Sequence, residues 1–306
     1  MAQRVAQAII ATAFIPMLSR RLLLLQILLI LASCAKETRT QRGKIIIGLV
    51  SYGEGIRSVD QFAPFSNYLA TQLKTLIELE PAYNEVKAIE QIKRRIWSLV
   101  FAPPGLAAIA LAKEQYLPLF PIEGINNLRS IIVVLQDSPL QKLADIAGKV
   151  VALGQAGSAT GYYLPIYNLY GMALAEVRFA PTPKTVLEWI EKREVAAGAL
   201  SKAEFDRYRS EFSQAKFRIL YTDPHNIPPG SVLVGPTVER NLQEQIRKVM
   251  KAASPDIAQA AGYIPNANVP DYKYLIQVVE RVRPIAERIK QKPAPLYEES
   301  QQSGAI

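Results

Sequence analysis

Cysteine and histidine are almost missing from this chain of 306 residues, which has one of each, Cys34 and His225. A single cysteine excludes an internal disulfide and any cysteine-based metal cluster. A single histidine excludes a metal site built from several imidazoles. We therefore expect neither a metal nor a cofactor.

The chain also lacks a strong basic cluster. Lys and Arg number 36 against 27 Asp and Glu, a formal net charge of +9. This excess is spread along the sequence, and its one cluster, Lys93-Arg94-Arg95, is typical of a solvated helix face. Nucleic acid is therefore not an expected partner. The positive balance would instead attract anions towards the surface.

No apolar run reaches the roughly 18–20 residues needed to span a bilayer. The run from Leu22 to Ser33 follows Arg20 and Arg21 and leads into Cys34, an order typical of an export signal. The tetrad Leu-Ala-Ser-Cys resembles the lipobox of bacterial lipoproteins, which implies an acylated Cys34 at the start of the mature chain. The alternative is a buried free cysteine after a hydrophobic helix.

This interpretation divides the first part of the chain. Residues 1–33 are expected to be a signal peptide, with Met17 as the true start, and residues 34–43 a lipidated cysteine and its polar tether. The protein is then exported to the periplasm or cell surface and held on a bacterial membrane by lipid.

Beyond the tether, strand-like and helix-like segments alternate. The β-branched run Lys44 to Val50 predicts a buried strand, and from Ser130 the alternation becomes regular. Such alternation predicts an α/β fold with mainly parallel sheets flanked by helices. Residues 291–306, rich in Pro, Gln and Ser, predict a disordered tail.

The segment Gly157-Ser158-Ala159-Thr160-Gly161 lies between a predicted strand and a predicted helix. Small residues allow an anion to approach the unpaired N–H groups of a helix's first turn, and two hydroxyls add donors. An oxyanion such as phosphate suits this chemistry. An ordinary serine N-cap with glycines for turning explains the same residues equally well.

Several motifs follow one another around this segment. They are Ser130-Ile131-Ile132-Val133-Val134, Asp137-Ser138-Pro139, Leu143-Ala144-Asp145-Ile146-Ala147-Gly148-Lys149-Val150 and Gly157-Ser158-Ala159-Thr160-Gly161-Tyr162-Tyr163-Leu164-Pro165. This order resembles the phosphate/phosphite/phosphonate substrate-binding lipoproteins of ABC importers, across roughly Lys44 to Tyr274.

The resemblance implies a two-lobed periplasmic-binding-protein fold (type 2) with the ligand in a cleft between lobes. Residues 44–129 and 236–290 would form one lobe and residues 130–235 the other. It also implies a monomer without catalysis that delivers a small phosphorus oxyanion to an ABC permease. The ligand-binding residues that it implies are Ser158, Ala159, Thr160 and Gly161 from one lobe, with Ser51 and Tyr52 from the other.

The chain departs from the family pattern at Ala159, at Pro183-Lys184, at Leu200-Ser201 and at Pro103-Pro104-Gly105. The family usually has a hydroxyl at the first position, a His at the second, an acidic residue at the third and a Tyr-bearing loop at the fourth. These losses disfavour an aminophosphonate.

Two other functions stay open. A sensory or scaffolding lipoprotein with a changed or lost ligand is the alternative that the departures favour. A hydrolase would have only Ser158 and His225 as a nominal nucleophile and base, without a Gly-x-Ser-x-Gly elbow.

Overall fold

The computed structural model describes residues 43–50, 58–124, 128–212 and 216–298. The predicted signal peptide, Cys34, most of the tether, Ser51 and Tyr52 lie outside the described residues. Among the helices that are described, none has the length and apolar character needed to cross a membrane.

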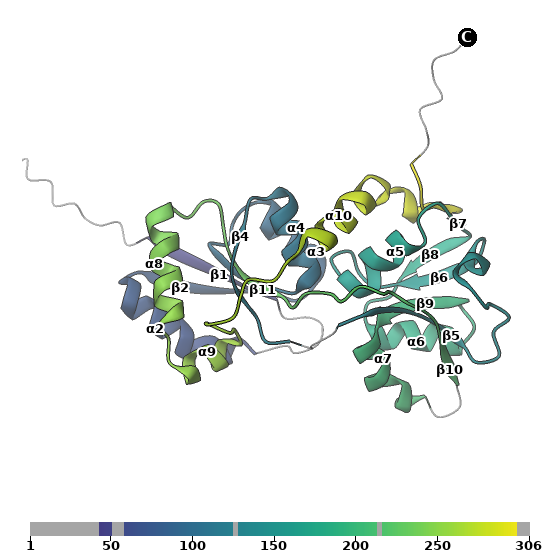
Figure 1. The fold of residues 1–306 in the computed structure, drawn as a ribbon, viewed down its shortest axis with the longest axis horizontal. Coiled ribbons are helices and arrows are strands. Elements are labelled where there is room, and N and C mark those ends of the chain that lie inside the picture. The colour runs from purple at the N-terminus through teal and green to yellow at the C-terminus, as the bar shows by residue number, and fades with distance from the viewer. Residues whose placement is uncertain (1–42, 51–57, 125–127, 213–215, 299–306) are drawn as a thin grey trace, which may run out of the picture. The chain divides into compact units, whose positions relative to one another are not determined.

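Two five-stranded sheets organise the chain from Lys44 onward (Figure 1). In each described sheet one strand, β11 in the first and β5 in the second, runs antiparallel to its neighbours. The mainly parallel α/β architecture is therefore confirmed. In spatial order the first sheet is β2 (Leu76–Ala82), β1 (Lys44–Val50), β3 (Leu99–Ala102), β11 (Ser231–Val234) and β4 (Leu117–Pro121). The second is β10 (Phe217–Thr222), β5 (Ser130–Leu135), β9 (Ala197–Ser201), β6 (Val150–Leu153) and β8 (Glu176–Phe179).

Helices cover both faces of each sheet. Because successive residues of a strand point to opposite faces, each strand contributes apolar side chains to the core on both sides. In β5, Ile131 and Val133 pack in one hydrophobic cluster and Ile132 and Val134 in another. Helices α2 (Ala63–Leu73), α8 (Arg240–Lys251) and α9 (Pro255–Ala261) pack on one face of the first sheet, with α3 (Glu85–Lys93) and α4 (Pro104–Lys113) on the other. Helices α6 (Pro183–Glu191) and α7 (Lys202–Tyr208) cover one face of the second sheet, and α5 (Leu164–Asn168) the other.

Two crossover segments connect the sheets, one from β4 to β5 and one from β10 to β11. An antiparallel bridge between Leu128 and Ile227 joins them. Arg129 of the first crossover donates to the carbonyl oxygens of Asp223 and Pro224 in the second, at 3.2 and 3.0 Å. These contacts fix the crossovers side by side.

The fully buried Asp223 organises the second crossover. Its carboxylate accepts hydrogen bonds from the Asn168 amide at 2.7 Å and from the backbone N–H of His225 at 2.8 Å. The His225 ring lies 3.0 Å from the same carboxylate and stacks on Tyr274. The only histidine of the chain therefore belongs to the junction between the sheets.

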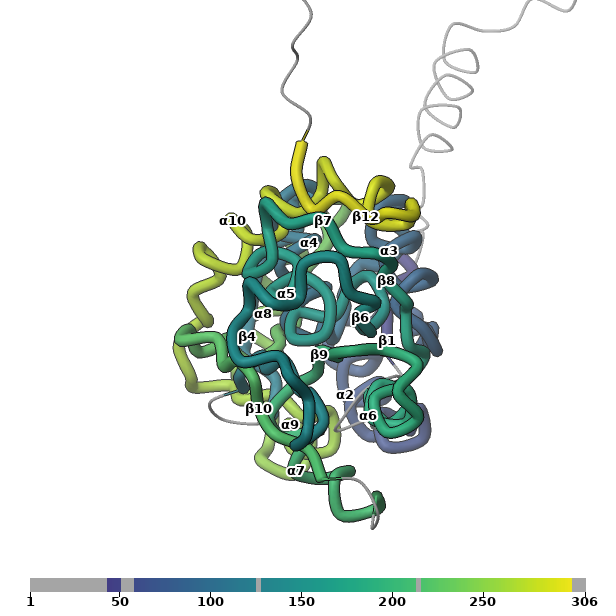
Figure 2. The backbone as a smooth tube through the Cα atoms, turned by 90° about the vertical axis from the view of Figure 1, so that its right-hand side faces the viewer, coloured from purple at the N-terminus to yellow at the C-terminus, as the bar shows by residue number. Residues whose placement is uncertain are grey.

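The expected lobe boundaries need correction at two places. Ser231–Val234, assigned by sequence to the second lobe, pairs within the first sheet, because the chain has already crossed back at Ile227. The expected disordered tail begins too early: Ala294–Pro295 forms a strand (β12) that pairs with β7 (Ala173–Leu174), as Figure 2 shows. Residues 299–306 lie outside the described residues.

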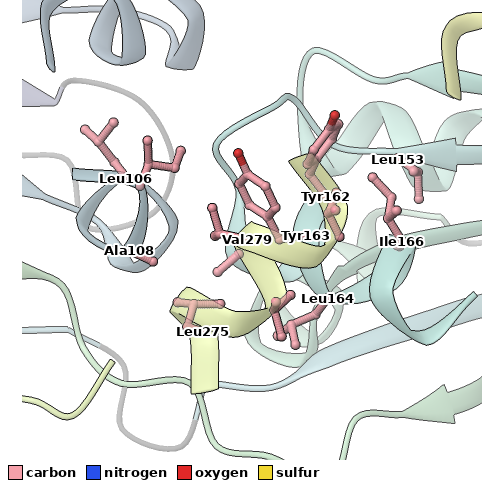
Figure 3. Close-up of a cluster of buried hydrophobic side chains, with 14 of the residues drawn as sticks. Leu106, Ala108, Leu153, Tyr162, Tyr163, Leu164, Ile166, Leu275 and Val279 are labelled. Atoms are coloured by element: carbon pink, nitrogen blue, oxygen red, sulfur yellow. The ribbon is translucent and has the colours of Figure 1, made fainter. Parts of the chain in front are cut away.

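Helix α10 (Lys273–Val282) also departs from the expected division, because it contacts both α4 and α5. Its residues Leu275 and Val279 lie between the side chains of these two helices in Figure 3. A single hydrophobic cluster thus connects helices that flank the two different sheets.

Candidate functional site

The 157–161 segment follows β6 and opens a short π-helix (η3, Ala159–Tyr163) that continues into α5. The Ser158 hydroxyl oxygen accepts the backbone N–H of Gly161 at 3.0 Å, so Ser158 is the N-cap. Gly157 has φ of 121°, a conformation that side-chain-bearing residues rarely adopt. The Ser130 hydroxyl, from β5, donates to the carbonyl oxygen of Thr160 at 2.6 Å. The segment is thereby fixed at the carboxyl end of a parallel strand, where α/β proteins commonly bind ligands.

Donors in this first turn are available. Within the described part of the chain, the backbone N–H groups of Ala159 and Thr160 have no hydrogen-bond acceptor. The Thr160 side chain is only 6% exposed, and its hydroxyl has no partner there either. Two N–H groups, a hydroxyl and the positive end of a helix dipole together form a site that suits an oxyanion.

Helix α4 packs directly on this turn from the first-sheet side. A Cβ atom added to Gly105 would overlap the carbonyl oxygen of Gly157 and lie 2.8 Å from the backbone nitrogen of Ala159. Only a glycine allows the two backbones to approach this closely. The first turn of α4 therefore lies against the backbone of Gly157 and Ala159.

Glu85, the first residue of α3, lies against the same turn. A Cβ on Gly157 would stand 3.1 Å from both Cβ and Cγ of Glu85. Burial raises the pKa of the Glu85 carboxyl, a hydrogen bond with its own backbone N–H opposes the rise, and the nearby Glu204 carboxylate adds to it. The stem of a partly buried acidic side chain thus packs on the 157–161 segment at Gly157.

The two tyrosines after the segment are both core residues. Tyr162 and Tyr163 are 3% and 8% exposed, and their rings meet edge to face at 5.0 Å. Burial raises the pKa of Tyr163 to about 12 and also raises that of Tyr162. Both side chains belong to the hydrophobic cluster drawn in Figure 3, and both hydroxyls stay protonated near neutral pH.

The structure brings four of the predicted ligand residues together: Ser158, Ala159, Thr160 and Gly161. The other two, Ser51 and Tyr52, lie outside the described residues. The hydrolase pair gains no support, because no hydrogen bond joins Ser158 to His225 in the described part of the chain: the Ser158 hydroxyl accepts the Gly161 N–H, and the His225 ring lies against Asp223.

Sequence reasoning missed Glu85 and Gly105. Each stands in a helix's first turn, Glu85 after the N-cap Asn84 and Gly105 in the turn that follows β3. Both helix starts can be recognised in the sequence. The contact of these two residues with Gly157, more than fifty positions away, cannot be predicted from it.

A family model described as "ABC transporter, phosphonate, periplasmic substrate-binding protein" matches residues 47–274. The match covers well over half of the chain, and the chain belongs to this family. It is therefore a periplasmic substrate-binding protein of an ABC transporter, a class that binds a small ligand outside the cytoplasm and passes it to a permease. No curated protein shows significant sequence similarity to it.

Solved structures support the two-lobed fold. XAC2383 from Xanthomonas citri, bound to ATP, has 21% sequence identity and a TM-score of 0.65, covering 79% of this chain and 98% of its own. PhnD1 from Prochlorococcus marinus, in complex with methylphosphonate, has 14% identity and a TM-score of 0.58, covering 78% and 98%. A phosphonate-transporter binding protein from Pseudomonas aeruginosa has 12% identity and a TM-score of 0.54, covering 81% and 88%. At these identities the likeness is one of fold.

Proposed function

We propose that this protein is a solute-binding lipoprotein that captures a small phosphorus oxyanion at the 157–161 segment for import. The observation that carries the proposal is the set of free donors there: the N–H groups of Ala159 and Thr160 and the Thr160 hydroxyl. The Ser158 hydroxyl accepts the Gly161 N–H, so its own proton is available for the ligand. Methylphosphonate and ATP, the ligands of two structural neighbours, both carry phosphorus oxyanions.

The test is calorimetric titration of the full chain in detergent with phosphate, phosphite, methylphosphonate, 2-aminoethylphosphonate, ATP and sulfate. Micromolar or tighter binding of a phosphorus oxyanion is expected, and it should be lost in a Ser158→Ala/Thr160→Ala double variant. Ser138→Ala is the matched control, because it removes a hydroxyl that also accepts a backbone N–H, that of Leu140, at a turn after β5. Absence of binding by the parent protein would contradict the proposal.

The proposal includes a lipid anchor on Cys34, with the mature protein acting as a monomer. Replacement Cys34→Ser should abolish incorporation of labelled fatty acid and release the protein from the membrane fraction. Retention of the label in the variant would contradict the anchor.

A sensory or scaffolding lipoprotein is the second candidate. The close packing of Gly105 on the backbone of Gly157 and Ala159 favours it, because this contact leaves little space for a ligand on that side of the turn. The same titrations separate the two functions, since a scaffold would bind none of the ligands.

A further inference from the structure

Glu85 reaches the candidate site from a different helix than the one that carries the serine and threonine hydroxyls. It opens α3, which packs on the first sheet, whereas Ser158 and Thr160 follow β6 of the second. Its Cβ and Cγ atoms lie over Gly157, where a Cβ atom would stand only 3.1 Å from each of them. Ile89, one turn later in α3, packs against the same glycine. The side chain of Glu85 is thus held at the edge of the donor-bearing turn.

The charge of Glu85 is not balanced by a neighbouring cation in the described part of the chain. The ion pairs of α3 join Lys87 and Arg94 to Glu90, on its exposed surface, and none includes Glu85. The carboxylate that Glu85 faces electrostatically is Glu204, which accepts the backbone N–H of Ser201 at 2.7 Å. These carboxylates repel an anionic ligand that enters this space, unless the ligand also carries a hydrogen-bond donor for one of them.

We propose that Glu85 is a specificity-determining residue that accepts a hydrogen bond from the ligand. The site would then select oxyanions that carry a donor, either a P–OH group or an ammonium substituent, against oxyanions without one. This inference rests on the proposed function and names the ligand class more narrowly. It also reopens the case for an aminophosphonate, because a carboxylate from α3 takes the place of the acidic residue missing after Leu200.

Hydrogen phosphate and sulfate provide the sharpest comparison. They have nearly the same size, shape and charge near neutral pH, but only hydrogen phosphate has a proton to donate. A carboxylate acceptor penalises sulfate, because two unprotonated oxygens would face one another. Methylphosphonate and 2-aminoethylphosphonate form a second pair, which differs by the ammonium group.

The experiment measures Kd for these four ligands in the full chain and in Glu85→Gln. The amide keeps the shape of the side chain, and it can donate to an unprotonated oxygen. We expect the preference for phosphate over sulfate to fall about tenfold in the variant, the scale of one hydrogen bond to a charged group. The preference for 2-aminoethylphosphonate over methylphosphonate should fall likewise. Glu90→Gln, on the exposed side of the same helix, should change neither ratio.

The outcomes separate the two proposals. If the parent protein binds a phosphorus oxyanion and both ratios are unchanged in Glu85→Gln, the role of Glu85 is overturned while the proposed function stands. If the parent protein binds none of the ligands, the proposed function fails and this inference fails with it. Thermal melts of both variants check that each is folded at the temperature of the titration.

Discussion

Replacing Gly105 by alanine tests the contact between α4 and the 157–161 segment, because this contact decides whether the substitution lowers or raises Tm. The new Cβ would overlap the carbonyl oxygen of Gly157 and approach the nitrogen of Ala159 to 2.8 Å. Carbon and nitrogen atoms in ordinary contact stand about 3.5 Å or more apart, so the backbones must separate by several tenths of an ångström at least. Both obstructing atoms belong to backbone, which cannot rotate away.

Overpacking of this kind typically costs about 1–3 kcal/mol. Alanine also favours the helix over glycine by up to about 1 kcal/mol. The net expectation is a loss of about 1–2 kcal/mol, which for a chain of this size lowers Tm by about 2–8 °C. Differential scanning calorimetry of the full chain measures it. The control is Gly124→Ala, because a Cβ at Gly124 meets no atom within 4 Å.

If α4 does not pack on the segment, only the helix preference remains, and Gly105→Ala should raise Tm. An unchanged or higher Tm would therefore refute the reasoning. The variant also bears on ligand binding: because Gly105 packs on the backbone of Gly157 and Ala159, a forced separation should change the affinity for any oxyanion that the Ala159 N–H binds.

Three further results are expected. Asp223→Ala should lower the free energy of unfolding in urea by about 3 kcal/mol, because it leaves buried donors unsatisfied, whereas Asp137→Ala, which breaks an exposed ion pair, should change it by less than about 1 kcal/mol; equal effects would contradict the buried role. Ser130→Ala should cost about 1–2 kcal/mol in the same assay by removing the bond to the Thr160 carbonyl, and no loss would count against that bond. The raised pKa of Glu85 means that the folded state favours its protonated form, so this stabilisation is present below the unfolded pKa and lost as pH rises through the folded pKa. The Tm of Glu85→Gln relative to the parent should therefore be higher at about pH 7.5 than at about pH 4, and a difference independent of pH would exclude the effect.

The elements that the sequence predicted well have strong local signals. The β-branched run Lys44–Val50 is a strand with the predicted bounds. Thr182, a residue type preferred at N-caps and followed by Pro183, caps α6. The strands β2 and β11 were missed, because Leu76–Ala82 contains two glutamates and a proline and Ser231–Val234 has only four residues. Their identity depends on pairing with strands distant in sequence, which no local pattern reports.

The 157–161 segment could be predicted because one short stretch contains its strand end, cap and donors. The residues that pack on this segment from α3 and α4 could not be predicted. Glu85 and Gly105 are ordinary helix-start residues until the fold brings α3 and α4 onto Gly157. Local signals can also mislead: Pro139 suits the first position of a helix, yet in the described chain no helix begins there, and a 3-10 helix begins only at Leu143.

Three helix starts, those of α3, α4 and η3, thus meet at Gly157 and Ala159, and each presents the positive end of its dipole. A carboxylate at Glu85 offsets this local positive potential, which offers a simpler role than ligand selection. The two roles make different predictions for Glu85→Gln. If the charge only neutralises the helix ends, its removal should strengthen the binding of every anion by a similar factor, and the ratio of phosphate to sulfate should not move. If Glu85 accepts a hydrogen bond from the ligand, sulfate should gain affinity while hydrogen phosphate and the ammonium-bearing ligand do not. The ratio, rather than either affinity alone, therefore decides whether this carboxylate recognises the ligand.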